Sequence, residues 1–257
     1  MFNCSFFANA HRLMNETLTT RLHRFTVARF SPQEKFGLHL TLGVLALLLA
    51  MAGFAEIAEA VVDGAPITAL DLRLANWLHL HANQSALLRN FLLGVTQLHS
   101  TPGVLGLAAL AGWWLVRHDA RHWMLTLVAA VPGGMLLNVA MKHVFARTRP
   151  HFDEPILLLS TYSFPSGHTV AATLLYGVLA CYCARRARSW KARAAIVAAA
   201  CAMVLLVAGS RLYLGAHYLS DVMAGMLEGC AWLAICVTSV ATLRRRQAAR
   251  ARRTEYR

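Results

Sequence analysis

The chain has 257 residues, of which 57% are hydrophobic and 14% are charged, and its formal net charge is +13. The mean hydropathy of +0.47 excludes an ordinary water-soluble domain of this length and indicates a multispanning membrane protein. A charge of +13 is also typical of proteins that bind nucleic acid, so the distribution of the cations has to decide between a membrane topology and a polyanionic partner.

Residues 1–35 contain five Lys and Arg, and Leu18, Leu22 and Phe25 recur in them at helical spacing. No apolar run precedes a small-residue cleavage site in this stretch, which argues against a cleaved secretory signal. We expect a cytoplasmic amphipathic segment that rests on anionic lipid headgroups. An organellar transit peptide, which is also rich in Arg and poor in acids, is the alternative.

Six apolar segments follow, and each approaches the ~20 residues that a spanning helix needs. Lipid offers no partner to an unpaired backbone group, so all six are expected to be helices. They comprise residues 36–56, 97–116, 122–142, 168–184, 194–211 and 219–243. The sequence therefore predicts an all-α, six-transmembrane-helix bundle over residues 36–243 and a basic cytoplasmic tail over residues 244–257.

Residues 59–96 form an outer segment between the first two apolar segments. Two stretches in it, 71–78 and 86–92, favour short helices that lie in the membrane interface, and Trp77 suits that depth. These helices either guide a lipid toward a site or cap the bundle.

The Lys and Arg residues are distributed unevenly about the six segments. Nineteen of the 25 fall on one side, and because positive residues collect in cytoplasmic loops, this predicts cytoplasmic termini and no nucleic-acid partner. The other side has a local balance of cations and acids, which indicates a site on the outer face. Its six cations are Arg73, Arg89, Lys142, Arg147, Arg149 and Arg211.

The six cysteines lie in the predicted helices or on the inner side, so no outward disulfide framework is expected. Cys181 and Cys183 are close enough in sequence to bind a metal together, but no His lies near them. We interpret them as small apolar filler and expect neither a metal nor a cofactor.

A first polar cluster ends the third apolar segment. Lys142 is followed, after six residues, by Arg149-Pro150, and Pro150 stiffens the chain as it leaves the helix. The two cations can converge on one phosphoryl group, Arg as a bidentate fork and Lys as a point charge. The alternative is a pair of interface anchors that extend toward water.

A second cluster, Pro165-Ser166-Gly167-His168, precedes the fourth apolar segment. It places Ser166 and Gly167 at a helix N-terminus, where free backbone N–H groups and a positive dipole suit an anionic oxygen. Ser166 can also be an N-cap, and the two roles are compatible. His168, one residue into the helix, can face the same anion as a proton donor.

In a third cluster, His217 and Asp221 are spaced i,i+4 at the start of the last apolar segment and share one helix face. The carboxylate can keep one imidazole nitrogen protonated and present the other as a nucleophile. Arg211, six residues before His217, can add a third cation.

The three clusters, Lys-x6-Arg-Pro, Pro-Ser-Gly-His and Ser-Arg-x5-His-x3-Asp, occur complete and in that order between residues 142 and 221. In this they resemble the three signatures of the type 2 phosphatidic acid phosphatase (PAP2) family, the membrane branch of a superfamily that includes vanadium haloperoxidases. The resemblance implies an all-helical bundle of the PAP2/haloperoxidase type and a metal-independent lipid phosphatase with a phosphohistidine intermediate.

Carried over by position, the resemblance assigns a role to each residue. His217 would attack phosphorus, Asp221 would orient it, and His168 would protonate the leaving oxygen and then act as base toward water. The phosphate would be held by Lys142, Arg149, Ser166, Gly167 and Arg211.

Four polar residues fall outside the signatures. Glu228 lies about 10 Å deeper than Asp221 on the same helix face at 1.5 Å per residue, and we assign it a protonated or hydrogen-bonded packing role. We assign Arg147 to an auxiliary phosphate contact. His143 and His151 are assigned to solvent or headgroup contact.

These observations favour a bacterial inner-membrane lipid phosphatase whose site opens on the periplasmic face. We expect undecaprenyl diphosphate as its substrate, with phosphatidic acid or phosphatidylglycerol phosphate as the second candidate. A phosphotransferase that passes the phosphoryl group to an acceptor other than water is an alternative. A lipid or ion transporter is another, although a transporter has no need of His217 backed by Asp221.

Overall fold

The computed structural model describes residues 20, 23, 37–82 and 84–255, with side chains up to residue 248. The predicted amphipathic segment 1–35 lies outside the described residues, apart from Thr20 and His23. Within the described ranges the chain forms eight long helices and no strand, so the predicted all-α class is confirmed. The helices are α3 (Leu38–Val62), α4 (Pro66–Ala82), α5 (Ala86–Leu98), α6 (Thr101–Arg117), α7 (Arg121–Phe145), α8 (Gly167–Arg186), α9 (Trp190–Tyr213) and α10 (Leu219–Glu255).

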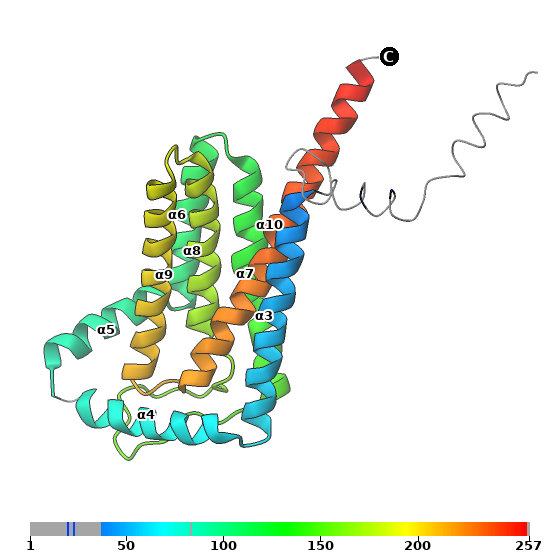
Figure 1. Cartoon of the computed structure of the whole chain (residues 1–257). Helices are drawn as coiled ribbons and strands as arrows, with labels where there is room; N and C mark the ends of the chain where they lie inside the picture. The colour runs from blue at the N-terminus through cyan, green and yellow to red at the C-terminus, as the bar shows by residue number, and fades with distance from the viewer. Residues whose placement is uncertain (1–19, 21–22, 24–36, 83, 256–257) are drawn as a thin grey trace, which may run out of the picture.

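Helices α3, α6, α7, α8, α9 and α10 form the bundle, in which α8 lies at the centre and α3 and α10 are inclined to α7, α8 and α9 (Figure 1). Half of the most apolar stretch of α8 is buried inside the protein, against 6% for α3. Leu42, Leu48 and Leu49 on α3 are more than half exposed. An apolar side chain that no protein atom covers is suited to lipid, so α3 is a peripheral helix and α8 is the core of the bundle.

Five of the described helices, α3, α7, α8, α9 and α10, are long and apolar enough to cross a membrane. The predicted span 97–116 is divided in the structure, because α5 ends at Leu98 and α6 begins at Thr101. Pro102 stands in the first turn of α6, where its missing N–H costs no hydrogen bond. With 17 residues, α6 is shorter than the ~20 residues that a spanning helix needs.

The outer segment forms two helices, α4 and α5, as its sequence predicts. In Figure 1, α4 lies across the end of the bundle, beside the loop that joins α7 to α8. Asp71 and Ala75 on α4 are buried, whereas Leu72 and Trp77 are more than half exposed. One face of α4 therefore packs against the bundle and the other is free to contact lipid.

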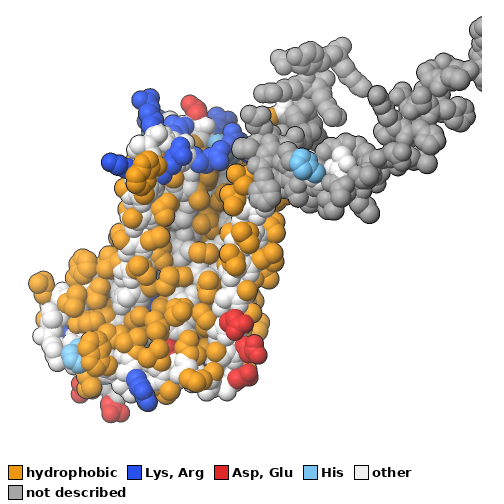
Figure 2. Space-filling view, in the orientation of Figure 1, with side chains coloured by type: hydrophobic (Ala, Val, Ile, Leu, Met, Phe, Trp, Pro, Cys, Tyr) orange, Lys and Arg blue, Asp and Glu red, His pale blue; other side chains and the backbone are white. Residues whose placement is uncertain are grey.

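The charges separate between the two ends of the bundle. Figure 2 shows Lys and Arg gathered at the end where α7 begins and α8 ends, and most of the visible Asp and Glu at the end covered by α4, where a basic side chain is visible as well. The last helix, α10, continues to Glu255 without a break at residue 243, where the sequence predicts the start of the tail. The sign of the charge thus distinguishes the two faces of the predicted membrane domain.

At the α4 end of the bundle, α10 approaches α8 very closely. A Cβ atom on Gly225 of α10 would lie 2.8 Å from the backbone oxygen of Ser166 and 3.2 Å from Cβ of Thr169. Only glycine fits this contact without a shift of backbone, so Gly225 sets the distance between the N-terminal ends of α8 and α10.

Candidate active site

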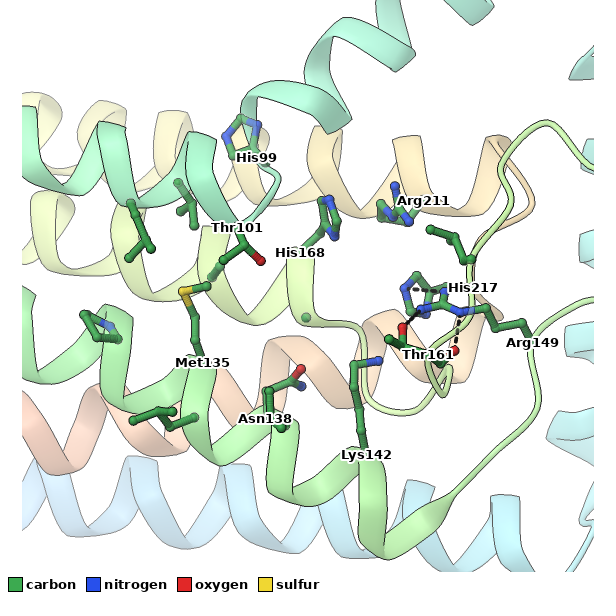
Figure 3. A pocket seen from close by; sticks show the side chains of 18 residues that line it. His99, Thr101, Met135, Asn138, Lys142, Arg149, Thr161, His168, Arg211 and His217 are labelled. Atoms are coloured by element: carbon green, nitrogen blue, oxygen red, sulfur yellow. Dashed lines mark hydrogen bonds between the residues drawn. The ribbon is translucent and has the colours of Figure 1, made fainter.

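The three sequence clusters meet at the α4 end of the bundle around one cavity of about 550 Å³. Six of the eight predicted site residues line this cavity, and Figure 3 shows their side chains converging from the ends of α7, α8 and α9 and from two loops. They are Lys142, Arg149, Gly167, His168, Arg211 and His217. The other two, Ser166 and Asp221, are fully buried behind the cavity wall.

Lys142 and Arg149 are fixed by carbonyl groups of the loop between α7 and α8. Lys142 Nζ donates to the carbonyl of Tyr162 at 2.6 Å, and Arg149 donates through Nε to the carbonyl of Thr161 at 2.6 Å. Arg149 also donates through Nη1 to the carbonyl of Ala216 at 2.6 Å. Burial lowers the pKa of Arg149 from its ordinary value, but a guanidinium stays protonated in proteins. Both cations are therefore held in place without a carboxylate among these partners.

Arg211 supplies the third cation and is 3% exposed. Its Nη1 donates to Thr96 Oγ1 on α5 at 2.5 Å, and its Nε has no partner among the described residues. A buried guanidinium with an unpaired donor is costly unless an acceptor enters the site. The arrangement is suited to an anion that binds in the cavity.

Ser166 and Gly167, at the start of α8, contribute backbone groups rather than side chains to the site. Ser166 Oγ accepts a hydrogen bond from Thr169 Oγ1 at 3.0 Å, and Ser166 N donates to the carbonyl of Asp221 at 3.0 Å. A Cβ on Gly167 would lie 2.9 Å from Asn138 Oδ1, so glycine allows α8 to begin close against α7. The Ser166 hydroxyl makes no capping hydrogen bond, and the first N–H groups of α8 are left for another acceptor.

His217 is held between Asp221 and Arg149 and is 2% exposed. Its Nδ1 lies 3.3 Å from Asp221 Oδ2, and its Nε2 lies 3.2 Å from Arg149 Nη1. A guanidinium can only donate, so Nε2 must be the acceptor and Nδ1 must carry the proton toward Asp221. Burial lowers the pKa of His217 well below its ordinary value, and the nearby cations add to that effect. The ring is therefore neutral, with the Nε2 lone pair on the side of the cavity.

His168 reaches the cavity from the first turn of α8, and Figure 3 places it near Arg211. The neighbouring lining residue His99 is not found by sequence reasoning. Its Nδ1 donates to the carbonyl of Val95 at 2.8 Å, and its Nε2 accepts from the hydroxyl of Tyr176 at 2.7 Å. Since both nitrogens of His99 are used, His168 is the imidazole better placed to exchange a proton with a bound group.

Behind His217, one arginine joins two buried carboxylates. Arg147 donates through Nη1 to Asp221 Oδ1 at 2.7 Å and through Nη2 to Asp71 Oδ2 at 2.9 Å. Asp71, on α4, also accepts from the backbone N–H and the hydroxyl of Ser220, at 3.0 and 2.5 Å. The expectation that Arg147 contacts phosphate is wrong, because two carboxylates engage its guanidinium and it does not line the cavity. Sequence reasoning gave Asp71 no role.

Glu228 makes the kind of contact that the sequence interpretation expects. Its Oε2 accepts a hydrogen bond from Asn138 Nδ2 at 2.9 Å, and its Oε1 has no partner among the described residues. Asn138 also lines the cavity. Glu228 is therefore one residue removed from the site and orients its wall.

No group of three or more His, Cys, Asp or Glu side chains that could hold a metal ion occurs in the part of the chain that the structure describes. That the reaction needs no metal stays a prediction, because metal independence is a property of the reaction and has to be measured.

Comparison with known proteins places the chain in a family. Residues 123–245 match the model of the PAP2 superfamily. The chain is 31% identical, over 143 residues, to phosphatidylglycerophosphatase B of Bacillus subtilis, covering 55% of this chain and 70% of that protein. It is 33% identical, over 129 residues, to an undecaprenyl-diphosphatase of Sulfolobus acidocaldarius. The matched region covers 46% of this chain and 55% of that protein.

Solved structures agree with the sequence relatives. The transmembrane PAP2-type phosphatidylglycerolphosphate phosphatase of Bacillus subtilis superimposes with a TM-score of 0.66 and 25% identity, over 74% of this chain and 93% of that one. LpxE of Aquifex aeolicus superimposes with a TM-score of 0.50 and 22% identity, over 65% of this chain and 94% of that one, which supports the fold. The family match, the coverage of the first relative and the three complete clusters around one cavity together show that this chain belongs to the PAP2 superfamily.

Proposed function

We propose that the protein is an integral membrane lipid phosphatase that hydrolyses a lipid phosphate or diphosphate through a phosphohistidine at His217. The observation that carries this proposal is the neutral His217, whose Nε2 faces a cavity lined by three cations while Asp221 accepts from Nδ1. A nucleophile, an orienting carboxylate and an anion site are the parts that covalent phosphoryl transfer requires.

In the first half-reaction, Lys142, Arg149 and Arg211 hold the non-bridging oxygens of the phosphoryl group. The N–H groups at the start of α8 add a partial positive charge. His217 Nε2 forms a bond to phosphorus as the bond to the leaving oxygen breaks, and His168 gives that oxygen its proton. Asp221 stabilises the positive charge that develops on the imidazole, because it accepts from Nδ1 throughout.

In the second half-reaction, His168 has lost its proton and can act as a general base. It takes a proton from water as the water oxygen attacks phosphorus, and the N–P bond electrons return to His217 Nε2. Inorganic phosphate then leaves the cations. The same two imidazoles thus exchange roles between the two halves of the reaction.

The cavity wall supports a lipid as the substrate. Beyond the cations it is lined by apolar side chains of α6 and α7, among them Val104, Leu105, Met135, Leu136 and Val139. Leu136 and Val139 are more than half exposed on the surface of the bundle. A lipid whose phosphate is bound by the cations would place its apolar tail along this wall. Polar contacts at one end and apolar contacts along the rest are expected for a site that binds an amphiphilic ligand.

The two candidate substrates differ in their apolar tails and in the bond that is cleaved, a phosphoanhydride in one and a phosphate ester in the other. Undecaprenyl diphosphate is the first expectation from the sequence, and one relative is an undecaprenyl-diphosphatase. A specific observation favours phosphatidylglycerol phosphate. The chain covers 70% of phosphatidylglycerophosphatase B of Bacillus subtilis, and a solved structure that it resembles is a phosphatidylglycerolphosphate phosphatase. We include both, with phosphatidic acid, in the test below.

We further propose that α6 crosses the membrane together with the five longer helices, which gives six spans. The chain then has three regions: an N-terminal cytoplasmic segment (1–35), the six-span domain (36–243) and a basic cytoplasmic tail (244–257). The support is that α6 packs against α7 and α8 and extends along them in Figure 1, and that the cations collect at one end in Figure 2. By the positive-inside rule that end is cytoplasmic, together with both termini, and the site opens on the periplasmic face of the inner membrane.

The test is release of inorganic phosphate by the detergent-purified protein from undecaprenyl diphosphate, phosphatidylglycerol phosphate and phosphatidic acid, with EDTA present. We expect release by the wild type and by Asp153→Asn, an exposed acid outside the site, and none by His217→Ala. Transfer of phosphate to a second lipid would instead indicate a phosphotransferase. Binding without turnover of any lipid would favour the transporter and overturn the proposal.

A further inference from the structure

A second cavity, of about 540 Å³, lies at the end of the bundle opposite the active site. Residues of α3, α7, α8 and α10 line it, including Arg185 near the end of α8. Gly167, at the other end of α8, is about 27 Å away along the helix at 1.5 Å per residue. The cavity is therefore separate from the active site and has no role in the proposed reaction.

The rim of this cavity is cationic. Arg185, Arg244 and Arg245 line it together with His39 and His122, and no carboxylate occurs among its described lining residues. Arg244 Nη1 lies 2.9 Å from His122 Nε2, and since a guanidinium only donates, that ring nitrogen is an acceptor on a neutral ring. The ion pairs between described side chains all lie at the active-site end. Among the described residues, Arg185 and Arg244 form no ion pair, so these two cations can receive an anion.

The wall below the rim is apolar. Trp123 on α7 and Val237, Val240 and Ala241 on α10 form it. A polar metabolite would make use of the arginines alone, whereas a phospholipid would place its phosphate on the rim and its chains along the wall. Basic pockets between transmembrane helices bind anionic headgroups in this way, and arginine pairs with phosphate through two parallel hydrogen bonds.

We propose that this second cavity binds an anionic phospholipid, with the headgroup phosphate on Arg185 and Arg244 and the acyl chains against Trp123 and α10. The proposal does not depend on the phosphatase assignment. Figure 2 shows the same end of the bundle covered by Lys and Arg, so the leaflet at that end is where an anionic lipid would gather.

Trp123 provides the measurement. The full-length protein is placed in nanodiscs made of phosphatidylcholine. One sample contains a small fraction of brominated phosphatidylglycerol and the other the same fraction of brominated phosphatidylcholine. Quenching of the tryptophan fluorescence by the bromine atoms is then recorded. The signal of Trp123 is the difference between the wild type and Trp123→Phe. We expect this difference signal to be quenched at a several-fold lower fraction of the anionic lipid than of phosphatidylcholine.

The double variant Arg185→Gln/Arg244→Gln should lose the preference for the anionic lipid. A cation near an anionic surface contributes about fivefold to the affinity, so removing two cations should abolish the several-fold preference. Arg188→Gln/Lys191→Gln is the matched control, because it removes two exposed cations from the same end outside the cavity, and it should keep the preference. The thermal unfolding midpoint of each variant reports whether it is folded.

Three results would overturn the proposal. Equal quenching by the two brominated lipids would show that the cavity takes no anionic lipid. Unchanged preference in a folded Arg185→Gln/Arg244→Gln variant would remove the assigned headgroup site. Loss of the preference on addition of inorganic phosphate, but not of sodium chloride at equal ionic strength, would show that the cavity takes free phosphate instead.

Discussion

Asp71 does not touch the cavity, yet we expect Asp71→Asn to slow catalysis. The carboxylate is fully buried and accepts from Arg147 at 2.9 Å and from the N–H and hydroxyl of Ser220 at 3.0 and 2.5 Å. Asparagine retains one acceptor oxygen. If that oxygen stays with Ser220, the new amide NH₂ faces the guanidinium of Arg147, and a donor meets a donor.

The size of the effect follows from the contact that is lost. A hydrogen bond to a charged group contributes about 1.5–3 kcal/mol, and about 1.4 kcal/mol in a barrier corresponds to a tenfold change in rate. Arg147 would then be fixed by Asp221 alone, and the Asp221 that orients His217 would be less well held. We expect kcat to fall about 10- to 100-fold with little change in KM, because Asp71 contacts no bound group.

The assay is steady-state phosphate release, with the thermal unfolding midpoint measured on the same preparations. Asp153→Asn is the matched control, since it is the same change at an exposed acid of the same end. The double variant Asp71→Asn/Arg147→Gln should lose little more kcat than the worse single variant, because both act on one contact chain. A kcat within twofold of wild type, together with a lowered unfolding midpoint, would refute the reasoning and leave Asp71 a purely structural role.

Three further predictions concern the site and its packing. Burial lowers the pKa of His217, so below about pH 6.5 the unfolded chain binds a proton that the folded chain does not, and stability should fall as the pH drops. Between pH 7.5 and 5.5 the thermal unfolding midpoint of His217→Gln should therefore fall less than that of the wild type. An equal fall in both proteins would contradict this. Arg149→Lys cannot reproduce the forked contacts, so kcat/KM should fall about 100-fold, whereas the exposed Arg73→Lys should change it less than twofold. Gly225→Ala should cost about 1–3 kcal/mol of stability because the new Cβ meets backbone at 2.8 Å; Gly209→Ala, with open space around it, should be neutral or stabilising, and a stable Gly225→Ala protein would show that the two helices can separate at no cost.

The sequence was most informative where a function is carried by neighbouring residues. The i,i+4 spacing of His217 and Asp221 predicts their contact, and the structure has it at 3.3 Å. The apolar segments predict the long helices for the same reason, since a span is a local property of composition. Lys142 and Arg149 also lie on the same cavity, as expected from their short separation.

Partners from distant parts of the chain could not be predicted in this way. Asp71, Thr96 and Asn138 reach the site from α4, α5 and α7, and their contacts depend on how the helices pack. No spacing in the sequence links an acid on α4 to Arg147. The break between α5 and α6 has a local signal in Pro102, but the apolar run across it hides the end of one helix and the start of the next.

The Ser166 hydroxyl shows how packing changes a local expectation. A serine before a helix is a natural N-cap or anion ligand, and in the structure it instead accepts from Thr169 and lies behind the wall of the cavity. The reason is the close approach of α10, which Gly225 permits and which directs the Ser166 N–H to the carbonyl of Asp221. A contact between two distant helices thus decides what a single serine can bind.

The three cations of the cavity have a consequence for the end of the catalytic cycle. They are fixed by carbonyls and a hydroxyl before any ligand arrives, so their mutual repulsion is present in the resting enzyme and is relieved whenever a tetrahedral oxyanion enters. The resting form carries this repulsion unrelieved, and inorganic phosphate leaves against the attraction that brought the substrate in. The cations that orient the substrate therefore also retain the product, and we expect inorganic phosphate to inhibit the enzyme by competing with the lipid.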